Sequence, residues 1–196
     1  MKQNKRLILA SASKRRRELL GTLHIPFDIF PSAVEEVIDP ELSPEENALN
    51  LAKLKAHDVA NDHSGLILGC DTLVATSTEI IGKPLNEKHA CEILGKLSGI
   101  RHRVISGLCL LDTFDKKEFC DVETTYVTFR KLTNAEILHY VRHHDVYDKS
   151  GSYALQEIGE SFVTKIEGSE SNIIGLPMEK LLIFLRQVLG VKSFVG

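Results

Sequence analysis

Hydrophobic residues in the first third of the chain fall into short apolar runs separated by stretches with helical spacing. The run within 6–10 predicts a buried strand, and leucines at helical spacing predict a helix over 13–23. Another short strand is expected around 27–30. The sequence Ser43-Pro44-Glu45-Glu46 indicates a helix start, with Ser as the cap and Pro at the first position, and this helix runs to about Asn61. The polar segment over 31–42 is predicted to be a loop.

Longer strands follow in the rest of the chain. The apolar segment from Leu66 to Val74 predicts a second buried strand. Two long β segments, about 102–111 and 118–129, are joined by a polar connection and predict an antiparallel hairpin. The remaining predicted elements are helices from Asn86 to about Gly99, from Thr133 onward and at about 178–189, and a strand at 162–166. This alternation predicts an α/β fold with a mixed twisted sheet and flanking helices.

Composition and charge narrow the class of protein. With 196 residues the chain is long enough for one domain, 1–196, with a sizeable core and two lobes. The net charge of −3 argues against a dedicated nucleic-acid binder, which would be strongly basic. No apolar run reaches membrane-spanning length or suits a signal peptide, so no membrane association is expected and the sequence predicts a cytoplasmic protein.

The four cysteines are Cys70, Cys91, Cys109 and Cys120. They form no C-x-x-C pair and have no histidine at ligand spacing. The spacing therefore predicts neither a zinc site nor a disulfide framework, and a reduced cytosolic protein fits better.

A run of four cations, Lys14-Arg15-Arg16-Arg17, stands where the first predicted helix begins. Ser11 or Ser13 can cap that helix. A helix N-terminus carries about half a positive charge, so cations are unfavourable there unless an anion is bound. Free backbone N–H groups, the dipole and guanidinium groups would then all point at a phosphate or polyphosphate. A solvated basic face or a nucleic-acid patch is the alternative.

Two carboxylate positions are candidates for chemistry. Asp71 lies at the end of a buried strand, where ligand sites form in open α/β sheets. It is either a metal ligand or base for water, or an Asp that caps a turn. Glu35 and Glu36 lie in the acidic loop and offer the oxygen ligands that Mg²⁺ and Mn²⁺ prefer, although for either residue taken alone a solvated loop is the simpler explanation.

Further candidates carry a positive charge or an amide. Lys53 and Lys55 are two apart on a helix, so at most one of them points at a site. Lys83 stands between Gly82 and Pro84, which restrict the backbone, and is either a phosphate clamp or a plain turn lysine. The amide of Gln156 could contact a base edge, or it could be a surface polar group.

Several short segments stand in a specific order along the chain. They are Leu9-Ala10-Ser11-Ala12-Ser13 with Arg15-Arg16 and Glu18-Leu19-Leu20, Glu35-Glu36, Lys55-Ala56, Asp71-Thr72, Gly82-Lys83-Pro84, Leu97-Ser98-Gly99, Val127-Thr128-Phe129, Asp148-Lys149 with Gly151 and Tyr153, and Gly175-Leu176-Pro177. Each segment is weak evidence alone. Their order and spacing together resemble the Maf family of nucleoside triphosphate pyrophosphatases over nearly the whole chain.

The resemblance implies a two-lobed single domain of the Maf/ITPase-like kind with a central substrate cleft. It implies a homodimer that hydrolyses a nucleoside triphosphate to the monophosphate and pyrophosphate, with a divalent cation, Mg²⁺ or Mn²⁺. In this resemblance Asp71 matches the general base, and Glu36 and Asp71 match the metal-binding carboxylates. The positions that hold the triphosphate are matched by Ser11, Arg16, Lys55 and Lys83.

Three further positions separate the subfamilies. Arg15, Thr72 and Gln156 resemble the subfamily that prefers dTTP and UTP, whereas the 7-methyl-GTP subfamily carries Trp, Gln and Glu there. Leu54 replaces a glutamate that is usual in the family, which implies a lower metal affinity. Two alternatives stay open: a 7-methyl-GTP pyrophosphatase, and a non-catalytic regulator of septum formation that binds nucleotides or nucleic acid.

Overall fold

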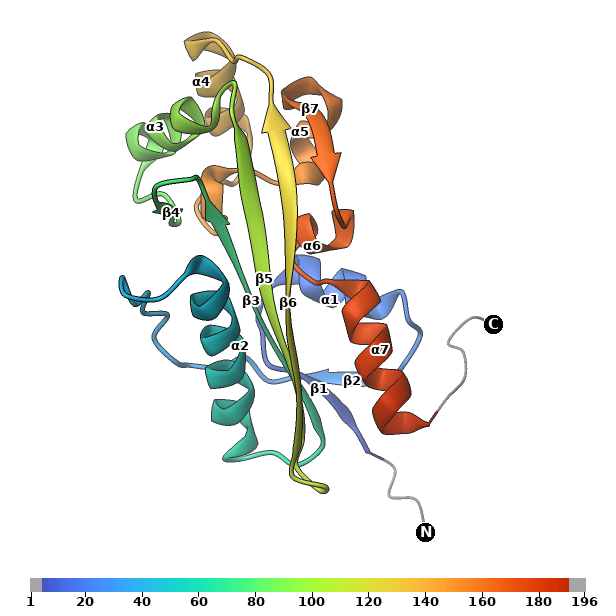
Figure 1. Cartoon of the computed structure of the whole chain (residues 1–196). Coiled ribbons are helices and arrows are strands. Elements are labelled where there is room, and N and C mark those ends of the chain that lie inside the picture. The colour runs from blue at the N-terminus through green and yellow to red at the C-terminus, as the bar shows by residue number, and fades with distance from the viewer. Residues whose placement is uncertain (1–4, 191–196) are drawn as a thin grey trace. The chain divides into compact units, whose positions relative to one another are not determined.

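The structure is a computed structural model that describes residues 5–190, apart from the side chains of residues 159 and 160. Figure 1 traces its elements along the chain. In order they are β1 (Leu7–Leu9), α1 (Lys14–Gly21), β2 (Phe27–Ile29), α2 (Pro44–Ala60), β3 (Leu66–Ala75), β4 (Ile80–Ile81), α3 (Glu87–Leu97), β5 (Arg101–Asp112), β6 (Lys117–Phe129), α4 (Asn134–His143), the 3-10 turn η1 (Ser150–Ser152), α5 (Leu155–Phe162), β7 (Val163–Glu167), α6 (Glu170–Ile174) and α7 (Met178–Leu189).

The strands form one mixed sheet, as the sequence predicts. Their order is β2-β1-β3-β5-β6-β7, and β4 pairs with β3. β1 runs parallel to both β2 and β3, whereas β4 is antiparallel to β3 and β7 is antiparallel to β6. β5 and β6 are hydrogen-bonded neighbours joined by the turn 113–116, and so short a connection joins antiparallel strands. The predicted hairpin is therefore confirmed.

The chain divides into two compact units. The first comprises the described residues up to Asp71, Ser106–Glu123 and the residues from Gly175 onward, and the second comprises Thr72–Ile105 and Thr124–Ile174. The proposed single domain with a cleft between two lobes stays a prediction.

Among the described residues, no helix is long and apolar enough to cross a membrane.

Successive side chains along a strand point to opposite faces of the sheet, and in the first unit both faces are apolar. Leu7, Leu9 and Leu68 pack with residues of α1 and α7, including Leu20 and Leu185. The neighbouring strand positions pack on the other side, against α2; they are Ile8, Ala10, Ile67, Cys109 and Leu111. In Figure 1, α2 accordingly lies on the opposite side of these strands from α7.

Two glycines bring α2 close to the sheet. A Cβ atom at Gly69 of β3 would lie 2.1 Å from the carbonyl oxygen of Ala52, and one at Gly107 of β5 would lie 2.1 Å from that of Ala48. Since a real Cβ atom does not approach an oxygen so closely, only glycine permits this contact between the helix and the strands.

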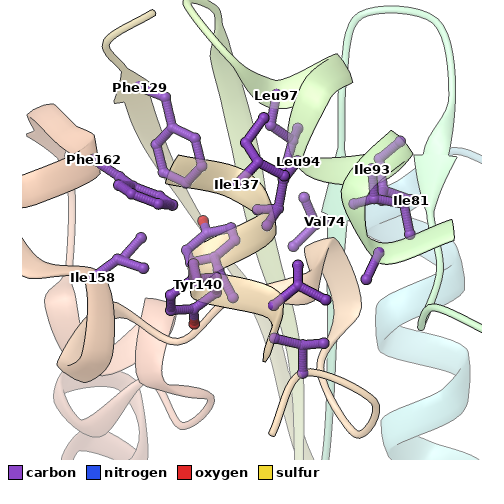
Figure 2. Packing of buried hydrophobic residues seen from close by; sticks show 14 of the residues in the cluster. Val74, Ile81, Ile93, Leu94, Leu97, Phe129, Ile137, Tyr140, Ile158 and Phe162 are labelled. Carbon is purple, nitrogen blue, oxygen red and sulfur yellow. The ribbon is translucent and has the colours of Figure 1, made fainter. Parts of the chain in front are cut away.

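The second unit has an aromatic and aliphatic core of its own, shown in Figure 2. The rings of Phe129 and Tyr140 both pack against Phe162, with centroid separations of 6.1 and 5.4 Å. Leu94 and Leu97 of α3 reach the same core.

The structure differs from the sequence prediction at element ends and in one whole segment. The helix predicted over 13–23 ends at Gly21, because the next three amides bond three residues back and tighten the chain. The strand predicted at 162–166 is β7, Val163–Glu167. Two short helices, α5 and α6, were not predicted, since the glycines of this segment suggested a loop.

Candidate active site

The basic run begins α1, and within it the Arg16 side chain donates two hydrogen bonds to other segments. Ser13 caps the helix and accepts a hydrogen bond from the Arg16 amide at 3.4 Å. The Arg16 guanidinium then turns back across the helix start. Its Nε donates to the carbonyl oxygen of Gly175 at 2.8 Å, and an Nη donates to Oγ of Ser11 at 3.1 Å. The side chain thus connects the end of β1 to the segment that precedes α7.

Gly175 is a second fixed point of this cluster. Its φ of 124° lies in the left-handed region, which favours glycine over any residue with a side chain. Its carbonyl also accepts from the Cys70 thiol, with a sulfur–oxygen distance of 3.3 Å. Burial raises the pKa of that thiol, although the nearby Arg16 charge acts in the opposite direction. Cys70 therefore stays protonated and serves as a donor rather than as a nucleophile.

A lysine between two carboxylates forms the other half of the site. Lys55 Nζ lies 2.5 Å from Oδ1 of Asp71 and 2.6 Å from Oε1 of Glu36. The Lys55 and Asp71 side chains are only 8% and 7% exposed, whereas Glu36 is 39% exposed. The sequence limits the candidates on this helix to one of Lys53 and Lys55, and the structure brings Lys55 to Asp71. Lys53 instead lies 3.6 Å from Glu118.

The acidic loop over 31–42 is hydrogen-bonded to α2 near both of its ends, and these bonds position Glu36. Near its start, Asp58 accepts from the Ser32 hydroxyl at 2.8 Å and from the Ala33 amide at 3.0 Å. Near its end, the buried Asn47 side chain accepts from the amide of Asp39 and donates to its carbonyl. The sequence did not predict these roles of Asn47 and Asp58, because neither residue belongs to a recognisable motif within its helix.

Both halves of the site stand where the parallel pairing of β1 with β3 ends. The expectation that Asp71 lies at the end of its strand is wrong, because β3 continues to Ala75 and pairs there with β4. Ser11 follows β1, and the Ala10 amide donates to the carbonyl of Leu68 in the neighbouring strand β3. Cys70 and Asp71 come next in β3 and point to opposite faces of the sheet. The cluster around Arg16 therefore lies on the face covered by α1 and α7, and the cluster around Lys55 lies on the face covered by α2.

Three of the predicted site residues belong to the second unit. The half-buried Thr72 follows Asp71 in β3, and its carbonyl accepts from the Ser150 hydroxyl at 3.4 Å. Lys83 is exposed on the turn after β4, and Gln156 is exposed on α5. Arg15, of the first unit, is half-buried in α1. A role for these four residues in one pocket with Asp71 stays a prediction.

An α/β sheet with guanidinium, ammonium and carboxylate groups where the parallel pairing of two strands ends is typical of proteins that bind phosphorylated ligands. The family model described as "Maf-like protein" matches residues 6–188. The chain therefore belongs to the Maf family.

Curated relatives cover nearly the full chain. A "dTTP/UTP pyrophosphatase" of Caldicellulosiruptor saccharolyticus is 42% identical, with 94% of this chain and 95% of the relative aligned. One of Ruminiclostridium cellulolyticum is 46% identical over 89% of this chain and 92% of the relative. A crystal structure of a nucleoside-triphosphatase / dITP/XTP pyrophosphatase from Mycobacterium abscessus aligns with a TM-score of 0.45 and 16% identity, over 94% of this chain and 96% of that one.

Proposed function

We propose that this protein hydrolyses dTTP and UTP to the nucleoside monophosphate and pyrophosphate. The names of the relatives support this activity, and they are 41–46% identical over most of the chain. The structural observation that carries the proposal is the Asp71–Lys55–Glu36 cluster, in which Asp71 belongs to β3. Such a cluster offers both a carboxylate for water and a cation for phosphate.

In the proposed reaction, the Asp71 carboxylate orients a water molecule and accepts its proton. The water oxygen forms a bond to the α-phosphorus while the bond from that phosphorus to the bridging oxygen of the β-phosphate breaks. The bonding electrons leave with pyrophosphate, so negative charge develops on that group. Ser11, Arg16, Lys55 and Lys83 are proposed to hold the triphosphate, and their cations stabilise the developing charge.

A divalent cation fits the donor set of this cluster. Glu36 and Asp71 reach the same ammonium group, and carboxylate oxygens are the ligands that Mg²⁺ and Mn²⁺ prefer. We therefore propose these two carboxylates as the metal ligands. When bound, the cation would neutralise phosphate charge and act as a Lewis acid. The homodimer stays a prediction from the resemblance, and the cytoplasmic location stays a prediction from the sequence.

Arg15, Thr72 and Gln156 are the proposed determinants of base choice. All three agree with the subfamily that prefers dTTP and UTP, so this reading is favoured over a 7-methyl-GTP pyrophosphatase. Release of pyrophosphate from dTTP, UTP, 7-methyl-GTP and ATP, measured with Mg²⁺ or Mn²⁺, compares these possibilities. Fastest release from dTTP and UTP is expected. Fastest release from 7-methyl-GTP would contradict the base assignment, and no release from any nucleotide would favour the non-catalytic regulator.

Replacing the proposed base tests the catalytic assignment. Asp71→Asn keeps the shape of the side chain but removes its ability to take a proton, so kcat should fall about 10²–10⁴-fold. The affinity for a non-hydrolysable dTTP analogue, measured by calorimetry, should stay within a few-fold. Asp121→Asn is the matched control, because that carboxylate lies 2.6 Å from Lys180 in a half-exposed ion pair away from the cluster. Wild-type turnover by Asp71→Asn would overturn the assignment.

A further inference from the structure

Two cysteines and a glutamate come together on the β5–β6 hairpin, away from Asp71. The Sγ atoms of Cys109 and Cys120 and a carboxylate oxygen of Glu118 all lie within 4.8 Å of one another. Cys109 stands three residues before the end of β5, and Cys120 stands three residues after the start of β6. Antiparallel pairing across the turn therefore places the two thiols side by side.

The spacing of these atoms suits a tetrahedral zinc ion. With Zn–S distances of about 2.3 Å and Zn–O distances of about 2.1 Å, ligand atoms of a tetrahedron are about 3.6–3.8 Å apart. The observed distance from Cys120 Sγ to Glu118 Oε2 is 3.8 Å. Cys109 is buried, Cys120 is half-buried and Glu118 is 35% exposed, so the cluster opens to solvent on one side.

Helix α2 places a histidine next to this cluster, although His57 is not among the ligand atoms that lie within 4.8 Å of one another. His57 Nε2 lies 2.5 Å from Oε1 of Glu118, so an imidazole borders the carboxylate. Lys53, one turn earlier on α2, has its Nζ 3.6 Å from Oε2 of Glu118. A metal ion would therefore compete with the Lys53 ammonium for the Glu118 carboxylate. Because Lys53 is 40% exposed, its ammonium can move into solvent at little cost.

We propose that Cys109, Glu118 and Cys120 form a zinc site, and that the exposed His57 side chain turns toward the ion as its fourth ligand and so joins α2 to the β5–β6 hairpin. Two sulfur donors and an imidazole favour zinc, whereas the all-oxygen donors of Glu36 and Asp71 favour Mg²⁺ or Mn²⁺. The two clusters therefore take different metals. The inference does not depend on the proposed reaction, since none of its four residues belongs to the Asp71 cluster.

Zinc bound in this position would stabilise the folded first unit. It connects the helix that carries Lys55 with the two strands beneath it, and it binds the folded chain in preference to the unfolded one. At a free zinc concentration a hundred times the Kd, Tm should rise by about 5–10 °C.

The test uses the full chain, reduced and freed of metal with a chelator, in buffer with excess Mg²⁺. Equilibrium dialysis should show one tightly bound zinc ion per chain. Co²⁺ in place of zinc should give the visible bands of a tetrahedral site together with a thiolate-to-cobalt charge-transfer band. Asp71→Asn should bind zinc as the wild type does, which separates this site from the proposed catalytic cluster.

Variants identify the ligands. Cys120→Ser should weaken zinc binding at least a hundredfold, and His57→Gln at least tenfold. Both side chains reach solvent, so both proteins should fold, as circular dichroism can verify. Cys91→Ser, a half-buried cysteine of α3, is the matched control and should bind zinc normally. The proposal fails if the reduced wild type binds no zinc, if cobalt gives no thiolate band, or if Cys120→Ser binds as tightly as Cys91→Ser.

Discussion

Arg16 illustrates how one side chain orders a site. Its planar guanidinium donates in two directions, to the Ser11 hydroxyl and to the Gly175 carbonyl, and these acceptors come from opposite ends of the sequence. An anion bound at the start of α1 would therefore meet a cation whose orientation is already fixed. Such preorganisation lowers the entropic cost of binding.

Arg16→Lys tests the value of this geometry. A lysine keeps the charge but cannot donate along both directions of the guanidinium fork. Loss of one charge-assisted hydrogen bond costs about 1.5–3 kcal/mol, so KM for dTTP should rise about 10–100-fold. Arg17→Lys, one position along on the exposed side of α1, should leave KM nearly unchanged. Equal effects of the two substitutions in steady-state kinetics would show that charge alone matters.

For single residues, the sequence indicated which side chains have the chemistry of a site, but it rarely indicated which other residues they contact. The expectation that Lys53 and Lys55 do not point the same way holds, because residues two apart on a helix do not share a face: Lys55 contacts Asp71, whereas Lys53 contacts Glu118. The roles of Cys70 and Asn47 were missed. Cys70 contacts Gly175, far away in the chain, and Asn47 contacts the loop that precedes its own helix, and neither residue belongs to a recognisable motif.

Helix α2 supplies or supports much of the first unit's chemistry. It carries Lys55, it holds both ends of the acidic loop through Asp58 and Asn47, and it presents His57 to Glu118. All of these contacts depend on how closely the helix lies on β3 and β5.

Gly107→Ala should disturb that packing. The added Cβ atom would lie 2.1 Å from the Ala48 carbonyl oxygen, so the helix backbone must move away. The free energy of unfolding should fall by about 1–3 kcal/mol, as in overpacked cores. Urea denaturation measures this loss, and activity should fall as well because Lys55 moves with the helix.

Gly95→Ala is the control for that substitution. Gly95 is exposed in α3 and has no atom within 4 Å of the added Cβ, so alanine should raise the free energy of unfolding by about 0.5–1 kcal/mol. Destabilisation by both variants would mean that the packing of α2 is not the cause.

The predicted elements succeeded where caps and periodicity agree. α2 and α4 both begin with a complete capping box, formed by Ser43 with Glu46 and by Thr133 with Glu136. α5 was missed although Leu155, Ile158 and Phe162 recur at helical spacing, because Gly159 suggested a loop. The proximity of Cys109 and Cys120 was not predicted for a different reason: the two cysteines are neighbours across a hairpin and not along the chain.

For the molecule as a whole, one buried histidine should control stability in mild acid. His102 is 1% exposed and hydrogen-bonds the Tyr153 hydroxyl at 2.9 Å, and burial lowers its pKa from 6.5 to about 4. Above pH 6.5 both the folded and the unfolded chain keep this ring neutral. Below pH 6.5 only the unfolded chain takes up the proton, so stability falls until about pH 4.

The loss should reach about 3 kcal/mol, since a tenfold difference in proton affinity corresponds to about 1.4 kcal/mol. Urea unfolding at pH 7 and pH 4.5 measures most of it. His102→Gln retains a partner for Tyr153 but does not titrate, so its stability should change less between these two pH values. An identical pH dependence in both proteins would assign the effect to other groups.

The α/β class, the mixed sheet and the β5–β6 hairpin were all predicted from the sequence, because strand and helix periodicities are local properties. The convergence of Lys55, Glu36 and Asp71 was expected only from the family resemblance, since the rule that ligand sites form at strand ends pointed to Asp71 alone. The hydrogen bonds of Arg16 to Ser11 and Gly175 could not be predicted from the sequence. They depend on the tertiary fold, because Gly175 is far from Arg16 in the chain and approaches it only in the segment before α7.

The opposite orientations of Cys70 and Asp71 limit how this chain can change during evolution. Many substitutions between Leu66 and Asp71 preserve the side of the sheet on which each position emerges. A single-residue insertion or deletion there does not, because it would send the carboxylate toward α7 and the thiol toward α2. Length variation in working descendants of this protein should therefore be confined to its turns, while this short stretch keeps a constant number of residues.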